Sequence, residues 1–226
     1  MIAGGAGGVI AGEAMQRRVA SIALAATLDA GFALAGSGAI REHGLTRRPT
    51  ADVDLFTDQR DTEAFGAAVA DIAAQLESEG FAVEVARHFE LFARLRVTQR
   101  GEEVDVDLGS DWRARQPVVL ALGPVLDEYD AVSNKVAALF SRAEARDYLD
   151  VDAIRRSGRF SDEQLLVGAA EHDDGFDRQV FTQALRQVER IGVRRVREYG
   201  VTEGELTGVR DRLIAWAAEI EAAAAD

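Results

Sequence analysis

The chain has 226 residues, 47% hydrophobic residues and a formal net charge of −13, which together predict a globular protein with a buried core. The absence of cysteine excludes disulfides, zinc–thiolate sites and thiol nucleophiles, and fits a reducing cytoplasm. The acidic total disfavours tight binding of nucleic acid over the whole surface.

The first half of the chain predicts alternating helices and short strands. The glycine-rich N-terminus lacks the basic stretch of a signal peptide and has no strand before its glycines, so we expect a frayed tail and no phosphate loop. No run is apolar enough for a membrane span. Periodicity then predicts, in chain order, a helix at 13–30 that Gly31 ends, a strand at 32–36, a brief helix from Ser37 to about His43, and a strand at 53–56.

The following segment predicts a small sheet of about five strands. Residues 61–80 read as a capped helix, and three extended runs cover 81–87, 91–98 and 103–109. Gly101 lies in the turn between the last two runs and predicts a hairpin. Pro117 and Pro124 indicate irregular structure or an edge strand. We therefore expect an α+β fold.

Only helical patterns follow residue 131. This change in pattern predicts two domains, a mixed α/β domain at 1–130 and an all-helical domain at 131–226. The first helical run, residues 131–156, reads as one helix. Five arginines fall between Arg186 and Arg197 against the single acid Glu189, which predicts a local basic stripe on an acidic body. Such a run is usually a solvated helix face.

Two aspartates stand out in the strand at 53–56. Asp52 and Asp54 are two residues apart, so an extended strand places both carboxylates on one face, about 7 Å apart. Two such carboxylates repel unless cations join them, which is the arrangement a two-metal phosphoryl-transfer site needs. Asp105 and Asp107 alternate with apolar residues in the same way, and the register decides which of them joins the pair. The alternative is an exposed strand face without function.

Two further features suit phosphate. Gly36 and Ser37 lie at a strand-to-helix turn, where backbone N–H groups and the helix dipole favour an anion. On a continuous helix, Lys135, Arg142 and Arg146 would align on one face with Asp150 and could grip a triphosphate. The alternative is a surface salt-bridge ladder with an Arg146–Asp150 pair. Lys135 is the only lysine beside 25 arginines, which favours a role for its compact ammonium.

These residues resemble a known family. The pair "GS" at 36–37 followed by "TADVDL" at 50–55 resembles the nucleotidyltransferase signature. The run "SNKVAALFSRAEARDYLDVDAI" at 133–154 resembles the helix motif of AbiEii/AbiGii-type nucleotidyltransferases, which include MenT-like, tRNA-modifying mycobacterial relatives and act as toxins of type IV toxin–antitoxin pairs. The resemblance covers about residues 32–154 and implies a polymerase-β-like nucleotidyltransferase domain followed by a helical domain.

The resemblance implies roles for the residues singled out above. Catalysis falls to Asp52, Asp54, Asp107, Lys135 and Asp150. Asp52, Asp54 and Asp107 would hold Mg²⁺ or Mn²⁺, and Asp107 is preferred to Asp105 because the family's third acid precedes a Leu-small pair, as Leu108-Gly109 does here. The NTP phosphates would be bound by Gly36, Ser37, Lys135, Arg142 and Arg146. Asp147 and Asp150 serve either as catalytic base or as structural partners. Apart from the resemblance, Arg47 or Arg48, just before Thr50, is a candidate contact for phosphate or acceptor, and the alternative is a solvated loop arginine.

The implied reaction transfers a nucleoside monophosphate from an NTP to an acceptor hydroxyl. By resemblance the acceptor is the 3′ end of a tRNA and the protein is a toxin with a cognate antitoxin. The arginine stripe keeps an RNA acceptor compatible with the net charge. Two alternatives stay open, namely transfer to a cationic small molecule such as an aminoglycoside or to a protein, and an inactive regulatory binding module. The three histidines show no metal-ligand spacing.

Overall fold

The computed structural model describes residues 9–10 and 12–224, so the glycines expected in a frayed tail, at 1–8, lie outside the described residues. The chain divides into two compact units. The sheet unit comprises residues up to Ala39 together with Thr50–Leu126, and the helical unit comprises Ile40–Pro49 and Asp127 onward. The helical unit therefore also takes in the segment 40–49, which the expected boundary at residue 130 placed with the sheet.

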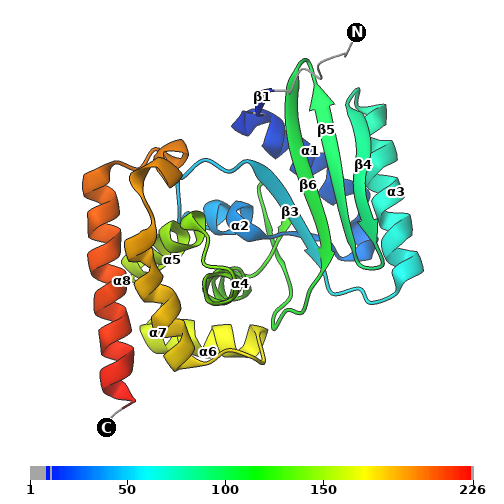
Figure 1. Ribbon diagram of the computed structural model, residues 1–226. Coiled ribbons are helices and arrows are strands. Elements are labelled where there is room, and N and C mark those ends of the chain that lie inside the picture. The colour runs from blue at the N-terminus through cyan, green and yellow to red at the C-terminus, as the bar shows by residue number, and fades with distance from the viewer. Residues whose placement is uncertain (1–8, 11, 225–226) are drawn as a thin grey trace. The chain divides into compact units, whose positions relative to one another are not determined.

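The sheet unit contains a mixed sheet with the strand order β4-β5-β6-β3-β2-β8-β7, and the short β1 pairs in parallel with the start of β6 (Figure 1). The pairs β3/β6 and β2/β8 are parallel, and the other neighbours are antiparallel. About five strands were expected, and the proline-containing segment adds the edge hairpin β7/β8. The strands are β1 Val9–Ile10, β2 Ala33–Leu34, β3 Asp52–Thr57, β4 Ala82–Phe89, β5 Phe92–Gln99, β6 Glu102–Ser110, β7 Val118–Leu120 and β8 Gly123–Val125.

Strict alternation gives this sheet two different faces. Every second residue of β3, β5 and β6 is buried and mostly apolar, with Leu55, Leu95 and Val106 fully buried. Helices α1 (Glu13–Ala26) and α3 (Thr62–Ser78) pack together over the sheet (Figure 1). The first helix ends earlier than expected, and a 3₁₀ turn, η1 (Leu28–Ala30), leads to Gly31. The short α2 (Gly36–Glu42) follows β2 directly.

The helical unit packs its helices around a mainly aliphatic core that includes a few aromatic rings. Phe181 meets Trp216 edge-on with ring centroids 5.3 Å apart, and both are buried. Capping boxes at Ser161 and Thr202 begin α6 and α8. In the described part of the chain, no helix combines the length and hydropathy that crossing a membrane requires. The elements are α4 Glu128–Ser141, α5 Ala145–Ser157, α6 Asp162–His172, α7 Arg178–Arg186, η2 Gln187–Arg190, η3 Val193–Arg195, η4 Arg197–Tyr199 and α8 Glu203–Ala223.

The expectation of one continuous helix over 131–156 is wrong. The chain breaks between α4 and α5, where Ala143 adopts a positive φ of 50°. The break is stabilised by a new helix start, because the Asp147 carboxylate accepts a hydrogen bond from the Glu144 backbone N–H at 3.1 Å. Lys135 therefore lies on α4 and Arg146 on α5, so the continuous cationic face drawn from the sequence does not exist.

A buried hydrogen bond joins two helices of this unit. The Tyr148 hydroxyl donates to the Ala184 carbonyl at 2.9 Å, and Tyr148 is 1% exposed. We expect Tyr148→Phe to lower the free energy of unfolding by about 1 kcal/mol, measured by urea denaturation. The control is Tyr129→Phe, because the Tyr129 hydroxyl bonds Glu171 at an exposed position. Equal losses in the two variants would contradict the assignment.

Candidate active site

The polar face of the sheet brings four carboxylates together. The parallel pairing of β3 and β6 sets Asp52 opposite Asp105 and Asp54 opposite Asp107. Cross-strand partners point to the same face, so all four acids share the face opposite α1 and α3. The register therefore aligns each β6 aspartate with one aspartate of β3. All four are half-buried, where like charges repel more strongly than in bulk water.

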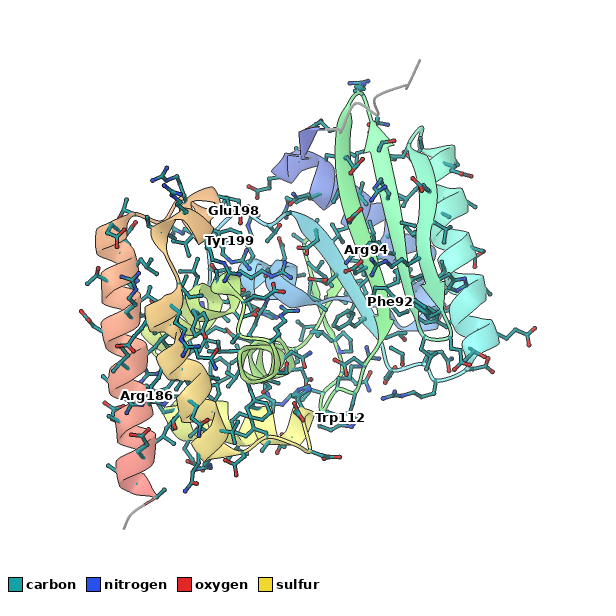
Figure 2. The ribbon with its side chains drawn as sticks, in the orientation of Figure 1. Phe92, Arg94, Trp112, Arg186, Glu198 and Tyr199 are labelled. Carbon is teal, nitrogen blue, oxygen red and sulfur yellow. The ribbon has the colours of Figure 1, made fainter. Side chains whose placement is uncertain are left out.

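Arg94 on the neighbouring strand β5 balances part of this charge (Figure 2). Its Nε and Nη2 donate to the two oxygens of Asp107, each at 2.5 Å, and its Nη1 lies 3.9 Å from Asp105 Oδ2. The hydrogen bond to Asp107, followed by the charges of Asp107, Asp105 and Asp52, raises the pKa of Arg94 above its ordinary value. Arg96, on the same strand as Arg94, lies 3.6 Å from Asp105 of β6.

The turn between β2 and α2 packs directly on Asp54. Gly36 has a φ of +54°, and a β-carbon added there would lie 1.9 Å from Asp54 Oδ2. The Ala35 N–H donates to the Asp54 carbonyl at 2.8 Å, which holds the turn in place. Ser37 is buried beside it. The sheet unit therefore brings together Gly36, Ser37 and the aspartate pair of β3.

The donor chemistry of this face suits a hard divalent cation. Carboxylate oxygens are the ligands Mg²⁺ prefers, and one or two of them suffice when substrate phosphates complete the shell. Asp52 and Asp54 meet that requirement. Among the described residues no cluster of three or more acidic or histidine side chains is arranged around one metal position. Asp107 is engaged by Arg94, so it could serve as a third ligand only if this ion pair opened.

The helical unit holds a second, fully buried ionic cluster. Arg48 donates from Nε and Nη2 to the two oxygens of Asp150 at 2.6 and 2.7 Å, and Lys135 Nζ lies 3.0 Å from Asp150 Oδ2. Asp150 is 0% exposed, and both cations are nearly as buried. Arg48 also stacks over the Tyr199 ring at 5.0 Å. The segment 40–49 is thereby fixed to α5, and the Lys135 ammonium to Asp150.

The surroundings of Asp150 determine its protonation. Burial alone would raise the pKa of this carboxyl, but the charge of Lys135 and the hydrogen bonds and charge of Arg48 outweigh it, so the pKa is lowered. A general base works best with a pKa near the operating pH. A carboxylate with a lowered pKa and three N–H donors is suited to holding cations in place.

Arg142 and Arg146 each pair with an acid near the helix break. Arg142 donates to both oxygens of Asp147 at 2.9 Å, and Arg146 lies 3.0 Å from Glu144. Asp150, the partner that the sequence offered for Arg146, is engaged by Arg48 and Lys135. Sequence reasoning missed Arg94 altogether. The signal for it was the alternation of Arg94 and Arg96 along β5, which matches the alternation of the aspartates on β6.

Comparison with solved structures identifies the class of fold. JHP933 from Helicobacter pylori matches with a TM-score of 0.55 and 14% identity, covering 92% of this chain and 90% of that chain. MenT4, a nucleotidyltransferase toxin from Mycobacterium tuberculosis H37Rv, matches with a TM-score of 0.53 and 18% identity, covering 91% and 83%. At these identities the likeness establishes a shared α+β fold. The search of curated proteins finds no match.

The family follows from the sequence itself. The model of the nucleotidyl transferase AbiEii toxin family, of type IV toxin–antitoxin systems, matches residues 20–207, and the chain therefore belongs to this family. The protein is a nucleotidyltransferase, which confirms the resemblance and the fold class drawn from the motifs at 36–55 and 133–154. The family implies an NTP substrate and a cognate antitoxin.

Replacing Gly36 tests the close approach to Asp54. We expect Gly36→Ala to displace the Asp54 carboxylate and to strain the backbone, lowering the free energy of unfolding by about 1–3 kcal/mol and strongly reducing nucleotide transfer. Gly66→Ala is the control, because a β-carbon at this position of α3 meets nothing within 4 Å. This substitution should raise the free energy of unfolding by up to about 1 kcal/mol. Unchanged transfer by Gly36→Ala would contradict the assignment.

Replacing Asp150 tests the buried cluster. Asp150→Asn leaves two buried cations facing a neutral amide, so we expect a loss of about 3–5 kcal/mol at neutral pH in chemical denaturation. Because the folded pKa of Asp150 is lowered, its contribution is present above its unfolded pKa of about 3.9 and is lost as the pH falls through the folded pKa. The difference between variant and wild type should shrink in that window.

The matched control for Asp150 is Glu163→Gln. Glu163 also has a lowered pKa, caused by its hydrogen bond to Arg178, but both partners are exposed. Solvent screens this pair, so its loss should change stability far less than the loss of Asp150. Similar effects of the two variants at neutral pH would show that burial does not set the strength of the Asp150 cluster.

Proposed function

We propose that this nucleotidyltransferase joins a nucleoside monophosphate to a hydroxyl at the 3′ end of an RNA, with tRNA as the acceptor suggested by the family. The acceptor oxygen forms a bond to the α-phosphorus of the NTP, the bond between the α-phosphorus and the bridging oxygen breaks, and pyrophosphate leaves with that oxygen. The acceptor proton passes to solvent. The observation that carries the proposal is the contact of Gly36 with Asp54, which sets a phosphate-binding turn against the aspartate pair.

Asp52 and Asp54 are the proposed ligands of a divalent metal, Mg²⁺ or Mn²⁺. Such an ion, when bound, neutralises phosphate charge and lowers the pKa of an attacking hydroxyl. Asp107 is the proposed third ligand and would have to exchange Arg94 for the ion. Asp105 is the alternative, since it faces Asp52 across the same pair of strands. When no metal ion is bound, Arg94 balances part of the negative charge of the acidic face.

The remaining roles concern the phosphates of the nucleotide. The turn at Gly36 and Ser37 is proposed to receive the β- and γ-phosphates through backbone N–H groups and the Ser37 hydroxyl. Lys135, Arg142 and Arg146 are proposed to neutralise the triphosphate, on the strength of their charge and the family's helix motif. Asp150 is assigned as a positioning residue, because its lowered pKa and bonds to Arg48 and Lys135 suit it to hold the Lys135 ammonium.

The wider setting follows from the family. We propose that the protein acts in the cytoplasm as the toxin of a pair and is restrained by its antitoxin. An inactive module is disfavoured because Gly36, Asp52, Asp54 and Lys135 are all present. Transfer to a cationic small molecule is disfavoured because Arg94 and Arg96 already compensate part of the acidic face.

Nucleotide transfer gives the direct test. Purified protein is incubated with Mg²⁺, each α-labelled NTP and total tRNA, and label on RNA is measured. We expect labelling that EDTA abolishes and that Asp52→Asn reduces more than about 100-fold. The control is Asp71→Asn, which removes an exposed acid on α3 of the same unit. Labelling that survives in Asp52→Asn would refute the assignment of this site.

A paired comparison tests the third ligand. Asp107→Asn should lower transfer and raise the Mg²⁺ concentration needed for half-maximal rate, whereas Asp105→Asn should leave that concentration nearly unchanged. The reverse order would transfer the role to Asp105. Label on an aminoglycoside or on protein, with none on RNA, would replace the proposed acceptor.

A further inference from the structure

Many arginines of the described chain form ion pairs with carboxylates, whereas one short segment carries four arginines that form none. In α7 and α8, Arg178, Arg186 and Arg212 each bond to a carboxylate at 2.5–2.8 Å. Between these helices the four arginines of the segment 187–200 are all exposed, and none of them forms an ion pair or side-chain hydrogen bond with another described residue. They are Arg190, Arg194, Arg195 and Arg197.

The backbone that carries these arginines is well anchored. Val188, Ile191 and Val196 point inward and are at most 5% exposed. Arg210 of α8 donates from Nη2 to the Ile191 carbonyl at 2.6 Å, and the Val201 N–H bonds the Val196 carbonyl. The short turns η2, η3 and η4 therefore present the four guanidinium groups from a fixed base, which reduces the entropy lost on binding a ligand.

The segment keeps a positive charge after its acids are counted. Glu189 and Glu198 are the acids of the segment, so four arginines leave a local charge of +2 on a chain of −13. Tyr199 adds no negative charge, because burial and the neighbouring Glu198 raise the pKa of its phenol (Figure 2). The surface is therefore suited to an anionic ligand that spans several cations.

We propose that Arg190, Arg194, Arg195 and Arg197 form a binding surface for the phosphate backbone of RNA. A guanidinium group donates two parallel hydrogen bonds to a phosphate, and four of them along one segment match a chain of phosphates better than a single anion. This inference rests on the proposed function, in which RNA is the acceptor. It adds the residues that would hold that RNA.

The same segment is poorly suited to bind a protein. Stable protein interfaces have an apolar core inside a polar rim. The apolar side chains Val188, Ile191 and Val196 are turned into the helical unit, and none of the large exposed hydrophobic residues of the described chain falls between 187 and 200. An acidic protein would find positive charge here but no apolar surface to bury. The phosphate backbone of RNA binds mainly through positive charge.

Binding is tested without catalysis. The affinity of the full-length protein for a labelled tRNA and for a 20-nucleotide single strand is measured against salt, without NTP or Mg²⁺. Replacing all four arginines by Gln should weaken binding at least tenfold at about 100 mM salt and reduce the slope of log K against log salt by about 3 for the single strand. Glu189→Gln with Glu198→Gln should instead tighten binding.

The matched control removes the same charge elsewhere. Arg60, Arg87, Arg100 and Arg156 are exposed, lie outside the segment and form no side-chain ion pair with a described residue. Their fourfold replacement by Gln should leave the salt slope nearly unchanged. An equal loss in both variants would overturn the proposal, because net charge alone would then explain binding. Displacement of RNA by polyglutamate at equal charge concentration would also overturn it.

The outcome is separable from that of the proposed function. If RNA binding depends on the four arginines but no label is transferred, the surface stands and the proposed reaction fails. If label is transferred with the same KM for RNA in wild type and fourfold variant, the reaction stands and the surface is refuted. Thermal unfolding checks the fold of each variant. The single substitutions Arg194→Gln and Arg197→Gln repeat the test with smaller changes. Each is expected to lower the slope of log K against log salt by about 0.7.

Discussion

The central constraint on the sheet unit is the mutual repulsion of carboxylates on one face. Alternation along β3 and β6 sends the apolar side chains beneath α1 and α3 and leaves four aspartates on the other face. The parallel register then sets them in opposed pairs. Cations lower this repulsion, and the chain supplies Arg94 and Arg96 from β5. The same repulsion makes the face receptive to a divalent metal.

The helical unit follows a related rule with a different result. There too an aspartate is held by the fork of an arginine, as Asp150 is by Arg48, but Asp150 is fully buried and takes a second cation. Beside a planar guanidinium that engages both carboxylate oxygens, Lys135 adds a compact ammonium, which needs less room than a second guanidinium. The one lysine in an arginine-rich chain therefore shares an oxygen that Arg48 already engages.

Local patterns predicted much of the fold. Alternating residues predicted β3 and β6, an extended run predicted β5, and a cap with apolar spacing predicted α3, because one short segment decides each of these elements. The continuity of α4 and α5 was mispredicted, since the break depends on the Asp147 carboxylate capping a new helix start. The partners of Asp150 were also missed, because Arg48 lies 102 residues away along the chain and only tertiary structure joins them. The pairing of Asp54 with Asp107 needed the register, which alternation alone leaves open.

Net charge describes this protein poorly, since what a ligand meets is the unpaired charge nearby. At physiological ionic strength, exposed charges more than about 8 Å apart are largely screened. An arginine bonded to a carboxylate presents little field at that distance, and the arginines of α7 and α8 named above are bonded in this way. The segment 187–200 departs from this pattern, because its four guanidinium groups pair with no residue that the structure describes and its apolar side chains are buried. An acidic protein can therefore hold a polyanion where one short segment gathers several cations that form no ion pair within the described chain.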